Sequence, residues 1–311
     1  MFFKKTIPFF YGQSDLTNSF YSKLFYCPHP FTNWSLNPLS KYNNELMHTC
    51  EGFRKTSDSN SIKIELEDHA GVCDIYSFGG STTYCDGLYN YKQSWPYKLR
   101  NKINENCKRL LINGGCGGWS SIQSLIRYST WGALIKPKIT IFYQSKNDLT
   151  PLYNGRKSEK KIFPLLENIM LQLDTSFNSN PRLYKKNNVG LASVYTDKIY
   201  ADKEGLNRLN EEWKNLYKSR CITVSQIASQ WNGKVLFIPE IYAEDSPYFQ
   251  PLNSMHEIMK NVADNSDNSI FFDIRKIYEH NSSDFLDNTH FSEKGSERFS
   301  EYVYKEIKKI I

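Results

Sequence analysis

The sequence predicts an α/β protein in which helices cover both faces of a parallel β-sheet. Short, continuous apolar runs recur from about residue 66 onward, and segments with apolar residues at helical spacing separate them. At 311 residues, the chain is also long enough to bury a large core. We therefore expect alternating strands and helices around one central sheet.

Five apolar runs are expected to form the strands. They cover residues 74–78, 109–112, 139–143, 235–238 and 270–272. Glycine pairs follow the first two runs, and Pro239 follows the fourth, as is usual where a strand gives way to a loop.

Apolar residues at helical spacing predict the helices. One contains Trp95, Leu99 and Ile103, and another begins near Ser120, which suits the N-cap position. The remaining helices are expected within residues 206–228, as one long helix or two short ones, around 258–262, and over 299–310.

The domain organisation follows from composition. Residues 1–65 are rich in proline, asparagine and serine, and we expect an irregular N-terminal segment that packs on a main domain of residues 66–311. The main domain carries an insertion at about 150–205. A loop of that length without structure is unusual, so we expect short helices inside it.

Charge and cysteine content exclude several classes of partner. The net charge is +6 without a basic stripe, so a nucleic-acid partner is not expected. The seven cysteines are scattered and include no Cys-x-x-Cys pair, which argues against a structural zinc site and favours a reducing compartment. No segment has the length of a signal peptide or a membrane span, so a cytoplasmic protein is expected.

Residues 78–83 carry the first candidate chemical group, Ser81. Two glycines precede it, and it falls where a strand gives way to a helix, so backbone N–H groups could favour a developing negative charge. A capping serine in a glycine-rich turn explains the same residues. No Gly-x-Ser-x-Gly elbow, P-loop or Gly-x-Gly-x-x-Gly pattern occurs, which argues against the α/β-hydrolase fold and against nucleotide binding.

Two further motifs follow the next two strands. Four glycines lie among residues 114–118, and the N–H of Gly118 could bind an oxyanion, although tight strand-to-helix packing explains the same cluster. Asn147 lies in the third loop and could aim its amide at the same point, although an Asn-Asp pair is also an ordinary turn.

The last motif is Asp287 with His290, ahead of the final helix. A carboxylate three residues before a histidine can bind Nδ1 and leave Nε2 free as a base for a serine nucleophile. A single Asp-x-x-His also occurs by chance, so the motif alone is only a hypothesis.

The ordered set of Ser81, Gly118, Asn147 and His290 resembles the SGNH (GDSL-type) hydrolases, whose name lists these residue types in this order. The resemblance spans residues 73–304, and residues 51–54 are similar to a segment that precedes the first block in many members. It implies a flavodoxin-like, three-layer α/β/α sandwich with about five parallel strands.

For the site, the resemblance implies that Ser81 is the nucleophile, that Asp287 orients His290, and that Ser81, Gly118 and Asn147 form the oxyanion hole. It implies no metal and no cofactor. Two positions depart from the family pattern: Gly80 replaces the usual aspartate before the nucleophile, and Ser145 stands where a glycine often precedes the Asn-Asp pair.

The predicted function is therefore a serine esterase that removes a small O-acyl group such as acetyl from a carbohydrate. The predicted partner is a small-molecule or glycan ester, and the oligomeric state stays open. An O-acyltransferase of the same fold acting on a glycan, and a non-catalytic glycan-binding module, are the alternatives that the sequence leaves.

Overall fold

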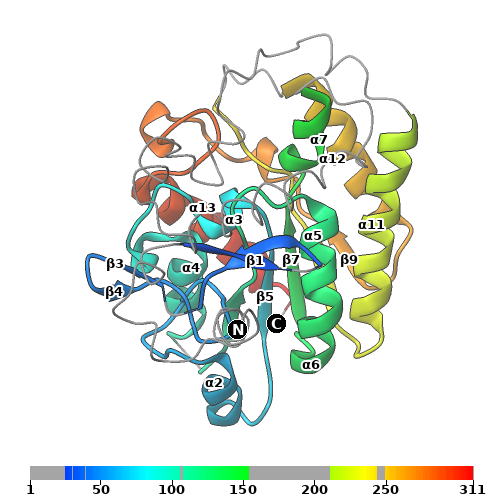
Figure 1. The fold of residues 1–311 in the computed structure, drawn as a ribbon. Coiled ribbons are helices and arrows are strands. Elements are labelled where there is room, and N and C mark those ends of the chain that lie inside the picture. Colours follow the sequence, from blue (N-terminus) through cyan, green and yellow to red (C-terminus); the bar gives the residue numbers. More distant parts are fainter. Residues whose placement is uncertain are drawn as a thin grey trace, which may run out of the picture.

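The computed structural model describes residues 25–29, 31–38, 40–105, 108–153, 211–243 and 249–310 (Figure 1). Its centre is a five-stranded sheet in which every neighbouring pair is parallel. The strands are β5 (Ile75–Gly79), β6 (Leu111–Asn113), β7 (Ile139–Tyr143), β8 (Lys234–Phe237) and β9 (Ser269–Phe271). Their order is β6-β5-β7-β8-β9, the flavodoxin-like arrangement in which ligands bind at the carboxyl ends of the strands. The predicted fold class is confirmed.

The second strand begins later than the sequence indicated. The prediction started at Arg109, whereas β6 starts at Leu111. Leu110 lies beside Asp74 just before the ladder begins, and its N–H donates to the Asp74 carboxylate at 3.0 Å. Residues 109 and 110 therefore lead into the sheet rather than forming part of it.

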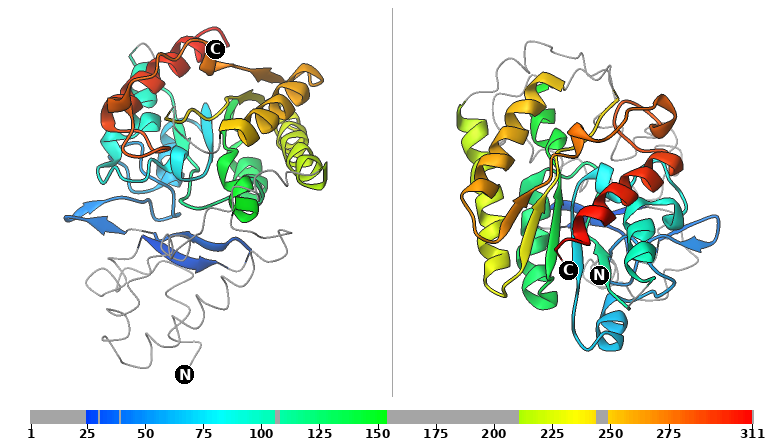
Figure 2. Two further views of the ribbon diagram at one scale, coloured as in Figure 1. Left: turned by 90° about the horizontal axis from the view of Figure 1, so that it is seen from above. Right: turned by 180° about the vertical axis from the view of Figure 1, so that it is seen from behind.

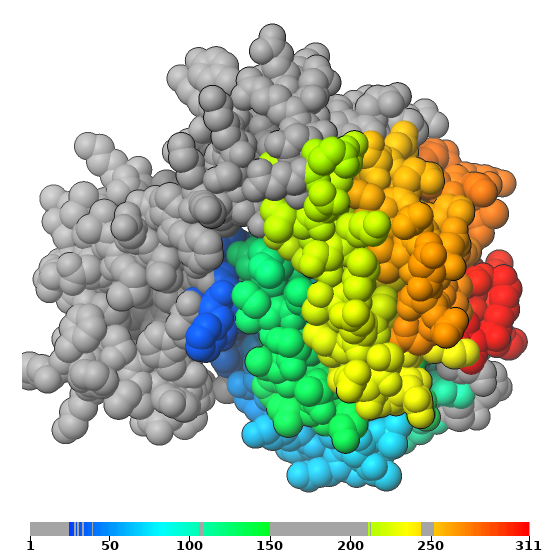
Figure 3. Space-filling view, turned by 90° about the vertical axis from the view of Figure 1, so that its right-hand side faces the viewer, coloured from blue at the N-terminus to red at the C-terminus, as the bar shows by residue number. Residues whose placement is uncertain are grey.

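Helices cover both faces of the sheet and produce three layers (Figure 2). One face carries α5 (Ser121–Arg127), α11 (Glu211–Ser229) and α12 (Phe249–Asp264), which lie side by side in Figure 3. The other carries α4 (Trp95–Ile103) and α13 (Glu293–Ile307). Because side chains alternate along a strand, Phe142 packs in the first core and Ile141 in the second.

Most helix predictions agree with the structure. Ser120 is the N-cap of α5, and its backbone N–H donates to Gln123 Oε1 at 2.9 Å. The segment expected around residues 206–228 is one helix, α11, from residue 211 onward, and residues 206–210 lie outside the described ranges.

Shorter elements complete the described chain. These are α2 (Ile62–Asp68), α3 (Ser81–Tyr84), α6 (Ala133–Ile135), α7 (Lys146–Tyr153), the π-helical turn Tyr128–Gly132, and the 3-10 turns Tyr91–Gln93, Ile274–Lys276 and Ser282–Asp284. Beyond α7, the predicted insertion lies outside the described residues.

The N-terminal segment contains two antiparallel hairpins rather than only irregular chain. β1 (Tyr26–His29) pairs with β2 (Asn33–Leu36), and β3 (Lys41–Tyr42) pairs with β4 (Glu45–Leu46). Helix α2 runs across residue 65, where the sequence placed the end of this segment. The division into an N-terminal segment and a main domain stays a prediction.

The first hairpin packs directly on the glycine-rich loop that follows β6. The indole of Trp34 donates to the Gly117 carbonyl at 3.0 Å, and the indole of Trp119 donates back to the Trp34 carbonyl at 2.9 Å. Both rings are buried. No helix in the described ranges combines the length and apolar character that crossing a bilayer requires.

Candidate active site

Three predicted site residues meet at the carboxyl ends of the strands. His290 Nε2 lies 2.9 Å from Ser81 Oγ, and His290 Nδ1 lies 2.7 Å from Asp287 Oδ2. Ser81 follows β5 after the single residue Gly80, whereas the other two belong to the loop before α13. The fold thus joins residues more than 200 positions apart into a hydroxyl–imidazole–carboxylate chain.

Ser81 is the first residue of α3, and Gly80 before it allows a close approach of two other loops. A Cβ at position 80 would lie 2.6 Å from Asn147 Nδ2 and 2.9 Å from the Trp119 carbonyl oxygen. Only glycine fits this position without displacing those groups. This close approach accounts for the glycine at position 80.

Asp287 uses its two carboxylate oxygens for different tasks. Oδ1 accepts the backbone N–H groups of Thr289 and His290, at 2.7 and 2.8 Å, and so closes a turn in its own loop. Oδ2 accepts from the His290 ring. Burial alone would raise the pKa of Asp287, but the hydrogen bond and charge of His290 outweigh it and hold that pKa well below its usual value. Asp287 is therefore a carboxylate at neutral pH.

Gly118 lies in the loop between β6 and α5 and has a φ of +74°, which favours glycine over residues with a Cβ. Its neighbour Gly117 is held by the Trp34 indole. The glycine-rich cluster also serves tight packing, since a Cβ at Gly115 would lie 2.4 Å from the Tyr84 backbone nitrogen. Tight packing thus explains part of this loop, and the role of Gly118 as an oxyanion donor stays a prediction.

Asn147 lies in the first turn of α7, and its Nδ2 donates to the Trp119 carbonyl at 2.8 Å. An amide nitrogen carries two hydrogens, so this bond occupies one of them. The neighbouring Asp148 is buried, and its carboxylate accepts the backbone N–H of Ser121, the first residue of α5, at 3.0 Å. The Asn-Asp pair therefore fixes the loop that contains Gly118.

Lys146 and Glu240 were not found from the sequence. The Lys146 ammonium donates to Thr289 Oγ1 at 2.7 Å, beside His290, and burial lowers the pKa of Lys146 although Glu240 and Asp287 oppose that shift. The buried Glu240 carboxylate binds both Thr82, next to Ser81, and Ser145. An acidic residue directly after the strand-ending Pro239 was the available signal.

His256 was not identified as a site residue from the sequence either. Its Nε2 lies 3.3 Å from Ser145 Oγ, and its Nδ1 lies 3.1 Å from the Arg275 guanidinium. Burial, together with the charge of Arg275, lowers the pKa of His256 to about 3. It is a neutral ring that supports the loop before Asn147.

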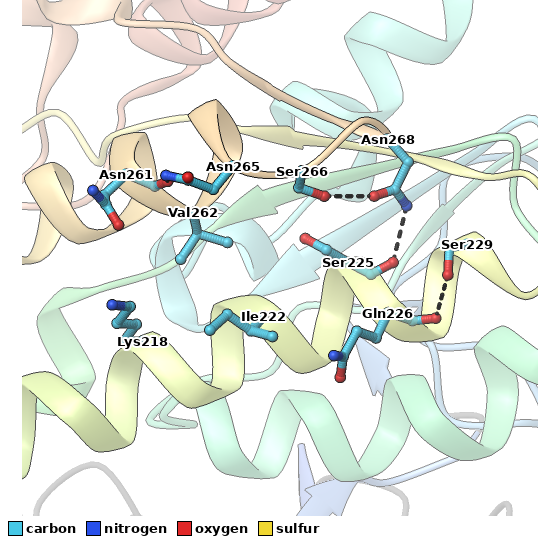
Figure 4. Close-up of a pocket in the computed structure, with 10 residues that line it drawn as sticks. All are labelled: Lys218, Ile222, Ser225, Gln226, Ser229, Asn261, Val262, Asn265, Ser266 and Asn268. Carbon is cyan, nitrogen blue, oxygen red and sulfur yellow. Dashed lines mark hydrogen bonds between the residues drawn. The ribbon is translucent and has the colours of Figure 1, made fainter.

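A separate groove lies between α11 and α12, at the opposite end of the strands (Figure 4). Asn268, which precedes β9, lies at its edge. Polar side chains that line the groove form hydrogen bonds with one another and with the neighbouring backbone. Asn268 Nδ2 donates to the Ser225 carbonyl at 2.9 Å, and Ser266 Oγ donates to Asn268 Oδ1 at 2.8 Å. Among the described residues, no three His, Cys, Asp or Glu side chains gather as a metal site would require.

The sequence matches no protein-family model and no curated protein sequence. Several solved structures resemble the fold. The chain is 14% identical to TesA, with a TM-score of 0.50, over 76% of this chain and 99% of TesA.

An acetyl xylan esterase from Geobacillus stearothermophilus is 13% identical, with a TM-score of 0.49, over 76% of this chain and 96% of its own. A protein from Desulfitobacterium hafniense assigned to the G-D-S-L family is 10% identical, with a TM-score of 0.48, over 75% and 98%. At such identities a likeness concerns the fold alone, and TesA provides the argument for it. The chain has the fold of the SGNH (GDSL-type) hydrolases.

Proposed function

We propose that this protein is a serine ester hydrolase that uses Ser81 as nucleophile. The observation that carries the proposal is the Ser81–His290–Asp287 chain of hydrogen bonds, 2.9 and 2.7 Å long, at the carboxyl end of a parallel sheet. Hydrogen-bond reach between nucleophile and base, with the base oriented by a third group, is the arrangement that activates a serine.

In the proposed reaction, Ser81 Oγ attacks the carbonyl carbon of the ester while His290 Nε2 removes its proton. The hydrogen bond between Asp287 and His290 Nδ1 orients the ring so that Nε2 can accept the proton. The negative charge of Asp287 stabilises the imidazolium that forms. His290 then gives the proton to the leaving alcohol. Water, activated by the same ring, releases the acid from Ser81.

The tetrahedral oxyanion would be bound by the N–H groups of Ser81 and Gly118 and by the Asn147 amide. A Cβ built on Gly80 would lie 2.6 Å from Asn147 Nδ2, so this amide lies close to the residue before Ser81, which supports its assignment to this group. Removing one such donor typically costs about 2.7–4 kcal/mol of transition-state stabilisation.

The test is hydrolysis of p-nitrophenyl acetate by the wild type and by Ser81→Ala. We expect loss of nearly all activity in the variant, because the members of a triad act as a unit. Ser129→Ala is a matched control, since Ser129 is exposed and its hydroxyl binds only the Ile126 carbonyl of its own helix among the described residues. Equal activity in Ser81→Ala and Ser129→Ala would refute the proposed function.

For the substrate, we propose a small O-acyl group on a carbohydrate. Support comes from a stacked aromatic pair, Tyr42 and Tyr89, whose ring centroids are 4.3 Å apart. Tyr89 is 52% exposed and lies in the chain that leaves α3, where the neighbouring Gly87 lies against Leu286 of the histidine loop. An exposed aromatic ring, two residues along the chain from a contact with the histidine loop, offers a surface on which a sugar ring can stack.

Tyr89→Ala tests this substrate class. We expect kcat/KM on an acetylated oligosaccharide to fall by about tenfold, which corresponds to about 1.4 kcal/mol of lost stacking, while kcat/KM on p-nitrophenyl acetate stays unchanged. An equal loss on both esters would contradict a glycan-binding role. Release of free acetate, rather than its transfer to an added glycan, separates hydrolysis from acyl transfer.

A further inference from the structure

Glu240 lies three residues beyond the end of β8 and is buried. Its Oε2 accepts four hydrogen bonds, from the backbone N–H of Ser145 (2.6 Å) and Lys146 (2.7 Å) and from the hydroxyls of Ser145 (2.7 Å) and Tyr242 (2.6 Å). Its Oε1 accepts from Thr82 Oγ1 at 2.7 Å. Five donors from three segments of the chain therefore converge on one carboxylate.

Two of these segments carry groups of the candidate site. Thr82 directly follows Ser81 in α3, and the Ser145–Lys146 N–H groups belong to the beginning of α7, one residue before Asn147. The first N–H groups of a helix have no partner within the helix, and a negative charge is favourable there. Glu240 supplies a hydrogen-bond acceptor and a negative charge at the start of α7, and it also binds Thr82 of α3. It therefore fixes α7 relative to α3.

The Gly118 loop, which carries another candidate oxyanion donor, is also linked to Glu240 through α7. Asp148 on α7 accepts the Ser121 N–H at 3.0 Å and the Ser121 hydroxyl, and so holds the start of α5, just after the Gly118 loop. On its other side, the Lys146 ammonium binds Thr289, next to His290. The position of α7 therefore sets the separations among Ser81, Gly118, Asn147 and the histidine loop.

We propose that Glu240 is a positioning residue that sets the geometry of the oxyanion hole by binding α3 and α7 with the two oxygens of one carboxylate. The inference rests on the proposed function of Ser81 as nucleophile. The same role explains why Ser145 stands where the family pattern often has glycine. The Ser145 side chain adds a hydroxyl that donates to Glu240 and so strengthens the link to α7.

Three substitutions distinguish the two arms of this link, which are the hydrogen bond of Glu240 to α3 and its hydrogen bonds to α7. Thr82→Val removes only the bond to α3 and keeps the size and branching of the side chain. Glu240→Gln keeps both arms, because its amide oxygen can accept the α7 N–H groups while its NH2 donates to the Thr82 hydroxyl. Glu240→Ala removes both arms. Positioning thus predicts a graded series, with Glu240→Gln the mildest and Glu240→Ala the most severe.

Matched controls make the same changes at buried sites away from the rim. Thr140→Val removes a buried hydroxyl that lies 2.7 Å from the Tyr128 hydroxyl, and Glu65→Gln changes a buried carboxylate paired with Arg100 at 2.7 Å. These controls should lower the melting temperature but leave the chemistry at Ser81 unchanged.

The experiment measures the rate at which a fluorophosphonate labels Ser81, and kcat and KM for p-nitrophenyl acetate. The melting temperature of each variant is measured on the same preparation. We expect labelling and kcat to fall on the order of 10²-fold in Glu240→Ala, about tenfold in Thr82→Val and less in Glu240→Gln, with KM within about twofold. Thr140→Val and Glu65→Gln should label at the wild-type rate.

Wild-type labelling rates in Thr82→Val and Glu240→Ala would overturn the inference and leave the proposed function intact. If Glu240→Ala does not fold, Thr82→Val measured against Thr140→Val decides the same point. A wild-type protein in which Ser81 is not labelled would instead overturn the proposed function itself.

Discussion

The two halves of the site are built differently. The sheet side, defined as Ser81, Gly118 and Asn147 with the segments that hold them, lies on strand ends and helix starts that buried groups fix from several directions. In the histidine loop, residues 282–292, the stretch 286–288 is exposed and the Asp287 side chain is 55% exposed, whereas Asp284, Thr289 and Phe291 are buried.

The histidine loop is held mainly by bonds to itself and to its base. The Leu286 N–H donates to the His290 carbonyl at 2.7 Å, and Asp287 closes the turn between them. At the base of the loop, the buried Asp284 binds Arg298 at 2.6 Å. Substitutions in the exposed part should therefore change activity without much change in stability, whereas substitutions on the sheet side should change both.

The largest effect on activity is expected from His290→Gln. Loss of the base should lower kcat by at least about 10³-fold, since the nucleophile is then not activated. The melting temperature should change little, because the ring binds only Asp287 of its own loop and Ser81 among the described residues, and Asp287 still accepts the backbone N–H of residue 290. A large drop in melting temperature would show that the histidine loop supports the fold.

Asp287→Asn should have the next largest effect, about 10²–10⁴-fold on kcat. The asparagine oxygen can still accept the N–H groups of Thr289 and His290, but an amide NH2 facing Nδ1 favours the wrong tautomer of the ring. Steady-state kinetics measure the loss. Wild-type kcat in this variant would exclude an orienting role for Asp287.

Gly80→Ala tests the sheet side. The added methyl group must displace the Asn147 amide and the Trp119 carbonyl, so we expect kcat to fall by about 10- to 100-fold and stability to fall by about 1–3 kcal/mol. Urea unfolding and kinetics on one preparation measure both. Loss of activity at unchanged stability would contradict the rigidity assigned to this side.

Acid should weaken the sheet side first. Burial lowers the pKa of His48, which binds Tyr84 of α3 at 2.9 Å, to about 3, and His256 behaves in the same way. Below about pH 6.5 the unfolded chain takes up protons at these rings, and the folded protein does not. The contribution of the neutral rings to the free energy of unfolding is therefore complete above that pH and is lost as the pH falls toward 3.

Each buried ring should cost about 1.4 kcal/mol of stability per pH unit in that window. Urea unfolding at pH 7, 6 and 5 measures how steeply the free energy of unfolding falls with pH. His48→Gln should reduce this slope by the contribution of one histidine ring. Identical slopes in the wild type and the variant would show that His48 is not kept neutral by the fold.

Thr289→Val should have the smallest effect. It removes the hydroxyl that Lys146 binds and so cuts a direct contact between the two halves. We expect a two- to tenfold fall in kcat, because the remaining bonds of the loop persist. Wild-type kinetics would show that the loop positions His290 without this contact.

Much of the fold could be predicted from local patterns. A buried parallel strand is a continuous apolar run, and β7 coincides with the predicted residues 139–143. The hairpins β1–β2 and β3–β4 were not predicted, because strands of two to four residues in polar chain give no clear periodicity.

The candidate site follows the same division. Ser81, Asp287 and His290 were identified because their motifs are short and ordered along the chain. The role of Glu240 depends on three segments meeting in space, and Pro239 before it was the only local sign. The cap that Asp148 forms on α5 likewise could not be inferred, since an Asn-Asp pair is typical of turns.

The most direct test of the account is a crystal structure of the protein with Ser81 phosphonylated by a small fluorophosphonate. The account predicts the phosphoryl oxygen within about 3.2 Å of the Ser81 and Gly118 nitrogens and of Asn147 Nδ2, with His290 facing the leaving-group side. A phosphoryl oxygen turned to solvent, or an adduct on another residue, would contradict it.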